Sequence, residues 1–347
     1  MNEKVYDQDT LQHLKQVELD ILKDFIKICQ KYNLTYFATG GTAIGALRHQ
    51  GFIPWDDDID VCMLRKDYDT FMRVAPKEMG DTYIFMDAHT EPRYPLMFGK
   101  MIKKGTRFIE EAYQQANYPL GIYIDIFPYD QTPENKSARE KLQKKTWNIG
   151  RMHVLTLIAT PKLPDTLNGF TAAVAAFGCK CIHALFHLFH VTPKKTYGKY
   201  LKYATNCPEP DSDLYIDYSY ITGQNLMIRT KEAFPTIEVP FEDTTVALVR
   251  NYDSFLRPEY GDYMQLPPEN QRHNTDKRWN SCIFAGKDLI NLTASLALLT
   301  FMRFDHTCFC QVLDKCKTHI RNGRCTIKSA LLLHLTDNML KHLLLIL

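Results

Sequence analysis

Apolar and polar positions alternate with helical spacing at two places near the start of the chain. Over residues 11–29 an apolar side chain recurs every three or four positions, with Lys, Glu, Asp and Gln between. This spacing predicts one amphipathic helix that packs along a single face. Over residues 65–74 the same spacing continues through Tyr68, Phe71 and Met72 and predicts a second helix.

A glycine turn lies between these two predicted helices. Residues 36–38 form a short apolar strand that runs directly into Gly40 and Gly41, and residues 42–49 predict a helix that begins behind this turn. A further strand is expected over residues 58–62. The predicted order is therefore strand, glycine turn, helix and strand.

The following part of the chain adds a strand and several helices. Residues 122–127 alternate between apolar and polar positions and predict a strand that ends at Pro128. Residues 131–165 are polar and predict a helix, whereas the richly apolar residues 166–192 predict a buried or surface-lying pair of helices. Residues 232–268 alternate again.

Composition and charge exclude several classes of protein. At roughly 150 residues per domain, the 347 residues suggest about two domains. Hydrophobic residues make up 45% and charged residues 24%, which excludes a disordered chain, a collagen-like fibre and a coiled coil. The net charge of +2 gives no argument for a nucleic-acid partner, and we expect none.

The cysteines and the apolar runs bear on the compartment. The N-terminus is polar and no uninterrupted apolar run reaches about 18 residues, so we expect neither a secretory signal nor a membrane span. Ten cysteines are too few for a disulfide scaffold in this chain, which favours a cytoplasmic protein with free thiols. Five of them lie in residues 281–347, a Leu-rich segment without Glu, Pro, Tyr or Trp. We expect a separate C-terminal element there, with a cysteine spacing that favours free thiols over zinc ligands.

Closely spaced aspartates are the first sign of chemistry. Asp58 and Asp60 share one face of their predicted strand because side chains alternate, and Asp56 joins them if the strand begins early. Two carboxylates on one face repel unless a cation lies between them or one binds a proton. Their oxygen atoms suit Mg²⁺ or Mn²⁺. Asp125, on a different strand, could supply a third carboxylate, and three carboxylates can hold two ions about 3.5–4 Å apart.

The glycine turn supplies the complementary half of a site. Gly40 and Gly41 let backbone N–H groups approach an anion, and the positive end of the following helix points at it. Metal-binding acids that face a phosphate-binding turn outline a site for phosphoryl or nucleotidyl transfer. Each part alone has an ordinary structural explanation, as a simple turn or a solvated acidic loop. The hypothesis therefore depends on their combination.

Four segments of the chain resemble the LicD family of phosphocholine transferases, which includes the fukutin-related proteins. The most specific is TGGTAIGALRHQGFIPWDDDIDVCMLRKDYDTF, residues 39–71. The others are KMIKKGT (100–106), GIYIDIFPYD (121–130) and YDSFLRPEYGDYMQLPP (252–268). The resemblance implies an α+β fold of the nucleotidyltransferase type: a small mixed sheet flanked by helices, with additional helical segments. It places a catalytic region in residues 1–280, with a helical insertion at about 131–200, ahead of the element at 281–347.

The resemblance also implies roles for individual residues. Members of the family are thought to move phosphocholine, or a related phospho-alcohol, from a CDP-activated donor to a sugar of a cell-surface glycan such as lipopolysaccharide, capsule or teichoic acid. CDP-choline is the first donor to consider, and the acceptor is a glycan or lipid-linked glycan. Asp125 would complete the metal site or accept the proton of the attacking hydroxyl. The motif assigns the phosphate-binding turn to Gly40, Gly41 and Thr42, and the metal to Asp58, Asp60 and Asp125.

Further candidates lie near these motifs. Lys100 and Arg48 are candidate cations for the charge of the donor phosphates and the leaving nucleotide, and His49 is a candidate base. A choline headgroup would need aromatic rings for cation–π contact. The rings that flank the acidic motifs are those of Phe52, Trp55, Tyr123 and Tyr129.

Two other functions stay open at this point. A nucleotidyltransferase could use the same acids, and it would release pyrophosphate where a phosphocholine transferase releases CMP. A non-catalytic module that binds a nucleotide or sugar phosphate is the third hypothesis, and the intact set of three acids disfavours it. Because glycan acceptors are often lipid-linked, peripheral association with the inner face of the membrane also stays open.

Overall fold

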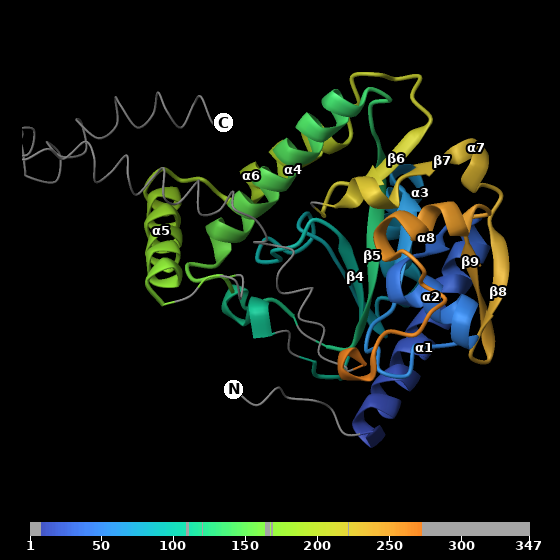
Figure 1. The fold of residues 1–347 in the computed structure, drawn as a ribbon. Coiled ribbons are helices and arrows are strands. Elements are labelled where there is room, and N and C mark those ends of the chain that lie inside the picture. Colours follow the sequence, from blue (N-terminus) through green and yellow to red (C-terminus); the bar gives the residue numbers. More distant parts are fainter. Residues whose placement is uncertain are drawn as a thin grey trace, which may run out of the picture. The chain divides into compact units, whose positions relative to one another are not determined.

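A mixed β-sheet forms the centre of the protein. The computed structural model describes residues 8–272, apart from 109, 110, 120, 164–166, 168 and 221. Within this part the sheet has the order β1-β2-β5-β4-β3, and β6 and β7 extend it beside the far end of β5 (Figure 1). The strands are β1 (Phe37–Ala38), β2 (Asp60–Leu64), β3 (Tyr83–Met86), β4 (Gly99–Lys103), β5 (Tyr123–Gln131), β6 (Leu214–Asp217) and β7 (Ile228–Arg229).

The two faces of this sheet differ in chemistry. β2 and β5 run parallel, whereas all other neighbouring strands of this sheet run antiparallel, so the sheet is mixed. The predicted α+β fold with flanking helices is confirmed. One face carries fully buried apolar side chains such as Val61, Ile124 and Ile126. The alternate positions, Asp60 and Asp125, lie on the opposite face.

Helices α1 (Gln8–Tyr32) and α3 (Arg65–Met79) contact each other and the central strands. In α1 the apolar positions fall on one buried face, as the sequence predicted. Helix α3 covers the apolar face of the sheet: Arg65 forms two hydrogen bonds of 2.8 and 2.7 Å with Asp130 on β5. Tyr68 packs so closely on Gly99 that a Cβ there would lie 2.7 Å from the tyrosine hydroxyl.

Three helices follow β5 in the chain: α4 (Lys136–Leu157), α5 (Gly169–Leu188) and α6 (Pro193–Ala204). Helix α4 packs along α6, and the buried imidazole of His153 on α4 lies 2.9 Å from both the Thr196 hydroxyl and the Tyr94 carbonyl. The helix predicted over 131–165 is thus present as α4. The predicted pair of helices over 166–192 is wrong, because α5 runs as one helix through the apolar stretch.

Helix α5 buries little of its apolar surface. Cys179 and Phe186 pack against Leu155 of α4. On its outer side Phe170 is 82% exposed and Phe177 66% exposed. Among the described helices, α5 is the one that is long and apolar enough to cross a membrane, although length and composition alone are weak evidence.

The remaining elements follow β6 or precede β2. Helix α2 (Gly40–His49) lies between β1 and β2, and it begins two residues earlier than predicted. Residues 232–268 contain a hairpin and a helix, where the sequence suggested only alternation. These elements are α7 (Thr230–Ala233), β8 (Ile237–Phe241), β9 (Thr244–Leu248) and α8 (Tyr252–Tyr260), with 3₁₀ turns at Glu111–Ala116, Gly223–Leu226 and Glu269–Gln271.

Two strand boundaries differ from the prediction. β2 begins at Asp60, so Asp58 precedes the strand. β5 continues through Pro128 to Gln131. The β4 pairing ends at Ile126 and the β6 pairing begins at Tyr129, so the missing N–H of Pro128 falls between the two antiparallel ladders. The predicted C-terminal element, residues 281–347, lies outside the described residues, and the two-part domain division stays a prediction.

Candidate active site

A row of three charged side chains crosses the polar face of the sheet. Asp60 on β2 pairs in register with Asp125 on β5, and Asp125 pairs with Lys100 on β4. Residues paired across neighbouring strands point to the same face, so the row is built by strand register. Asp60 is 9% exposed, and Asp125 and Lys100 are 1% exposed. The structure therefore brings together two of the predicted acids, 65 residues apart in the chain, with the predicted cation.

Lys100 is the counter-ion of Asp125. Its ammonium lies 2.8 Å from the carboxylate, and it also stands 3.1 Å from the centroid of the Tyr123 ring. A buried charge needs such partners, because transfer out of water costs several kcal/mol. The sequence nominated Lys100 for the donor phosphates and Asp125 for a metal. In this structure they bind each other, and both nominated roles stay predictions.

Asp58 and Asp60 form the acidic end of the row. Burial and the neighbouring charges raise the pKa of both carboxyls well above the usual range. Burial contributes most to both pKa shifts. The next contribution to the Asp58 pKa comes from the charge of Asp60, and the next contributions to the Asp60 pKa come from the charges of Asp125 and Asp56. The buried Oδ1 of Asp60 has no hydrogen-bond partner among the described residues. Both observations indicate negative charge that a cation would stabilise.

The donor set fits a hard divalent cation such as Mg²⁺ or Mn²⁺. Within the described residues, no group of three or more His, Cys, Asp or Glu side chains is arranged to hold a metal. A pair of carboxylates is nevertheless sufficient for Mg²⁺, which ordinarily takes one or two protein carboxylates and completes its shell with substrate phosphates and water. Asp58 and Asp60 are the residues that would hold it. The cofactor itself stays a proposal.

The glycine turn lies against these carboxylates. Gly40 has φ +56°, which favours glycine, and a Cβ there would lie 3.3 Å from Oδ2 of Asp60. A Cβ on Gly41 would lie 2.1 Å from Oδ2 of Asp56, so a larger residue there would displace that carboxylate. The Thr42 hydroxyl accepts a 2.8 Å hydrogen bond from the Asp60 backbone N–H. The turn thus positions Asp56 and Asp60, and its predicted contact with phosphate remains a prediction.

Sequence reasoning missed two charged residues of α1. Glu18 is buried, its Oε2 has no hydrogen-bond partner among the described residues, and burial and the charges of Asp57 and Asp56 raise its pKa well above the usual range. Lys15 donates 2.9 Å hydrogen bonds to the carbonyls of Ile53 and Pro54, ahead of the acidic loop. A glutamate within the apolar stripe of an amphipathic helix was the available signal.

Asp217 is a further buried acid that the sequence did not single out. It ends β6 and pairs in register with Tyr129, so it points to the same face as the charged row. The N–H and the hydroxyl of Ser219 each donate a 2.7 Å hydrogen bond to its carboxylate. Burial raises its pKa to about 7. A single aspartate in an apolar strand gives no sequence signal that separates it from an ordinary edge residue.

Arg48 and His49 serve the fold in this structure. The Arg48 guanidinium donates to the carbonyls of Tyr263, at 2.6 Å, and Gln265, at 3.2 Å, and so ties α2 to the segment after α8. Its Nε donates to Nε2 of His49 at 3.0 Å. Burial and the Arg48 charge lower the pKa of His49. The nominated roles in phosphate binding and as a base stay predictions.

The four rings nominated for choline do not form one box. Each has a separate partner. The Tyr123 ring faces the Lys100 ammonium, and the Tyr129 hydroxyl donates 3.0 Å to the Leu226 carbonyl. The other contacts are Phe52 with Phe241, at 5.0 Å between centroids, and Trp55 with His49, at 6.4 Å.

The row of acids and the glycine-rich start of α2 lie within residues 33–159, which match the family model described as LicD/FKTN/FKRP, nucleotidyltransferase domain. The chain is 30% identical over 268 residues to the lipopolysaccharide cholinephosphotransferase LicD of Haemophilus influenzae, which covers 76% of this chain and 94% of that protein. The protein belongs to the LicD family, as the sequence motifs predicted. It is also 34% identical over 117 residues to an uncharacterized protein of Rickettsia prowazekii, 33% of this chain and 40% of that one.

Proposed function

We propose that this enzyme transfers phosphocholine from CDP-choline to a sugar of lipopolysaccharide or a related lipid-linked glycan, with Mg²⁺ as cofactor. The observation that carries the proposal is the likeness to the cholinephosphotransferase, which extends over 94% of that protein. The family model, over residues 33–159, includes the segment that folds into the acidic row. The donor, the cofactor and the compartment are the parts of the proposal that need direct tests.

The proposed chemistry is a displacement at phosphorus. The acceptor hydroxyl oxygen forms a bond to the phosphorus that carries choline, the bond from this phosphorus to the bridging oxygen breaks, CMP leaves, and the proton of the hydroxyl passes to water. Mg²⁺, when bound, would neutralise the charge of the donor diphosphate. Asp58 and Asp60 would hold the ion. The positive end of α2 faces the same space and favours the approach of phosphate.

Lys100 and Asp125 have a positioning role in this proposal. The ammonium of Lys100 binds Asp125 beside Asp60, which fixes the row on the sheet face. An ion-paired carboxylate is a weaker base than a free one, since the neighbouring cation favours the charged form. We therefore assign Asp125 to organising the site rather than to accepting the proton of the acceptor hydroxyl.

The proposal places the enzyme in the cytoplasm, at the inner face of the membrane. Helix α5 supports a peripheral contact: its outer side presents Phe170 and Phe177 to solvent, with Lys180 and His187 on the same side. An apolar helix face with basic residues is typical of helices that lie in the plane of an anionic bilayer surface. A lipid-linked acceptor would be reached from there.

The experiment that tests the function measures transfer directly. Purified protein is incubated with CDP-choline, lipopolysaccharide lacking phosphocholine, and Mg²⁺ or EDTA, and both CMP release and phosphocholine incorporation are followed. Asp58→Asn and Asp60→Asn should each abolish Mg²⁺-dependent transfer, because each removes one carboxylate charge and almost no volume. Asp69→Asn, on the exposed side of α3, is the matched control and should retain activity.

Three results would contradict the proposal. Near-normal transfer by both Asp58→Asn and Asp60→Asn would overturn the assignment of the acids. Release of pyrophosphate from CTP without transfer from CDP-choline would indicate nucleotidyl transfer instead. Activity that is undiminished in EDTA would remove the metal from the proposal.

A further inference from the structure

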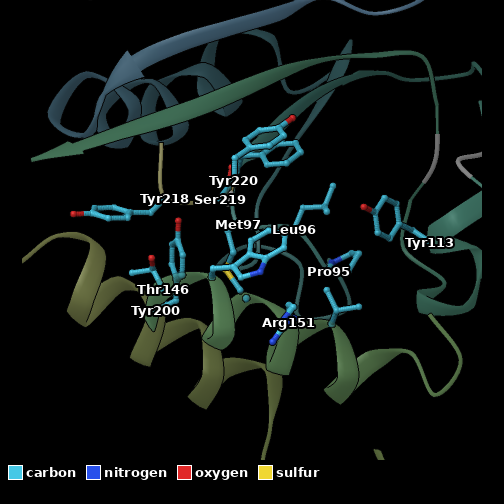
Figure 2. A pocket seen from close by; sticks show the side chains of 14 residues that line it. Pro95, Leu96, Met97, Tyr113, Thr146, Arg151, Tyr200, Tyr218, Ser219 and Tyr220 are labelled. Atoms are coloured by element: carbon cyan, nitrogen blue, oxygen red, sulfur yellow. The ribbon is translucent and has the colours of Figure 1, made fainter. Parts of the chain in front are cut away.

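Aromatic side chains line a pocket beside the charged row. The pocket lies among α4, α6, the segment before β4, the segment after β6 and the 3₁₀ turn that carries Tyr113, and its cavity volume is about 40 Å³ (Figure 2). Its surface is mostly apolar. The rings that line it are those of Phe98, Tyr113, Trp147, Tyr200, Tyr218 and Tyr220.

The pocket adjoins the charged row through two phenylalanines. Phe127 stands two residues after Asp125 on β5, on the same face, which corresponds to about 7 Å along the strand. Its ring packs on Phe98 at 4.4 Å and on Tyr220 at 5.7 Å between centroids, and both of these rings line the pocket. Phe127 and Phe98 thus connect the acidic row to the ring cluster of the pocket.

Few polar groups in the pocket are available to a ligand. The Thr146 hydroxyl donates to the Leu142 and Gln143 carbonyls, at 3.0 and 2.9 Å, and the Tyr218 hydroxyl donates to Thr132 at 2.9 Å. A sugar would therefore leave most of its hydroxyls without partners in the pocket. A group that makes no hydrogen bonds suits such a lining better.

The one arginine of the lining is directed elsewhere. Arg151 donates from Nη2 to Asn148 on its own helix, at 3.0 Å, and its charge acts on the thiol of Cys179 on α5. In Figure 2 its nitrogen atoms point away from Tyr218 and Tyr220. The guanidinium therefore serves the contact between α4 and α5, and Arg151 is the one charged residue among the described side chains that line the pocket.

A buried carboxyl group lies next to the rings. Ser219 lines the pocket and donates two hydrogen bonds to the buried carboxylate of Asp217. The charge of Asp217 acts on the phenol of Tyr200, whose hydroxyl has no hydrogen-bond partner among the described residues. Aromatic faces with a nearby carboxylate attract a quaternary ammonium, which cannot donate a hydrogen bond but interacts with ring quadrupoles.

We propose that this pocket is the subsite for the trimethylammonium end of the donor, with Phe98, Trp147, Tyr200, Tyr218 and Tyr220 as its aromatic walls. The phosphate of the same phosphocholine group lies at the acidic row, which is next to the pocket. This inference rests on the proposed function for the identity of the donor. It replaces the four rings nominated from the sequence, which have other partners.

The test measures binding separately from transfer. Titration calorimetry gives dissociation constants for choline, CDP-choline, CDP-glycerol and CDP with the wild-type chain and three variants. Tyr220→Leu removes a half-buried ring at the rim, and Tyr220→Phe retains the ring. Trp55→Leu probes the rival location beside the acidic loop. Wild type should bind CDP-choline more tightly than CDP-glycerol.

The expected pattern is specific to the ring. Tyr220→Leu should weaken CDP-choline binding roughly 3- to 30-fold, the range of a cation–π contact from exposed to desolvated, and leave CDP within about twofold. Tyr220→Phe and Trp55→Leu should bind CDP-choline as wild type does. Unchanged CDP-choline binding in Tyr220→Leu, a loss in Trp55→Leu instead, or no preference for CDP-choline over CDP-glycerol would overturn the proposal.

Transfer assays on the same proteins separate the two proposals. If the wild type transfers phosphocholine and Tyr220→Leu transfers it equally well, the proposed subsite is wrong and the proposed function still holds. Ring-dependent binding of choline without transfer to any lipopolysaccharide would keep the subsite and refute the function.

Discussion

The buried pair of Lys100 and Asp125 gives the sharpest test of how the charged row is built. Both side chains are almost fully buried, at 1% and 2% exposure, and their charged atoms lie 2.8 Å apart. Replacing Lys100 with Met retains most of the side-chain volume but leaves the Asp125 carboxylate buried beside Asp60. Breaking a buried pair by removal of one partner costs about 3–5 kcal/mol of unfolding free energy. For a domain of this size the melting temperature should fall by roughly 10 °C.

A second substitution identifies the cause of that loss. Asp125→Asn introduced into Lys100→Met removes the uncompensated charge, so the double variant should regain most of the lost stability while transfer stays absent. The assay is urea unfolding followed by circular dichroism, with free energies extrapolated to water. The control is Lys27→Met, which breaks a pair of the same 2.8 Å length at the surface and should cost less than about 1 kcal/mol.

The reasoning has a clear point of failure. If Lys100→Met loses less than about 1 kcal/mol, the ammonium is not the counter-ion that keeps Asp125 buried. If the double variant is as unstable as Lys100→Met, the loss comes from packing around the lysine stem and not from the orphaned charge.

Three further predictions test other parts of the structure. Because the Asp217 pKa of about 7 lies above the 3.8 of an ordinary aspartate, its protonated form favours the folded state, and stability should fall as the pH rises from 4 to 8. The unfolding free energy of Asp217→Asn in urea should therefore rise relative to that of the wild type by up to about 4 kcal/mol over this pH range. A difference between the two proteins that does not change with pH would contradict the buried carboxylate. Gly41→Ala should lower kcat/KM on the order of 10–100-fold, since its Cβ would overlap Oδ2 of Asp56, and Asp56→Ala in the same chain should recover part of the loss. Phe170→Ser with Phe177→Ser should weaken sedimentation with anionic vesicles but leave CDP-choline binding unchanged, and equal sedimentation would refute the membrane contact of α5.

The elements that the sequence predicted well are those with strong local patterns. The apolar stripe of α1, the α2 helix that starts at the two glycines and the α3 helix all follow from spacing within a few residues. Errors arose where neighbouring strands decide the outcome. β5 passes through Pro128 because its antiparallel partners change there, and this cannot be seen within the strand's own sequence.

The sequence by itself determined the family and the acids that carry the hypothesis. Its motifs place Asp58, Asp60 and Asp125 in recognisable surroundings, because they are short segments whose spacing is local. It could not assign Lys100, whose side chain is equally suited to a phosphate or a carboxylate until its neighbours are known. Strand register decided that Lys100 faces Asp125, since the residue opposite on the next strand is set by the sheet and not by distance in the chain.

Tertiary structure also decided which buried groups surround the site. Glu18 lies 107 residues before Asp125 in the chain, and Asp217 lies 92 residues after it, yet both are buried acids near the charged row. The aromatic pocket combines rings from α4, α6, a 3₁₀ turn and two loops that are adjacent only after folding. Local patterns report helices, turns and strands, whereas burial and charge pairing depend on contacts between distant segments, and those exist only once the sheet and its helices are assembled.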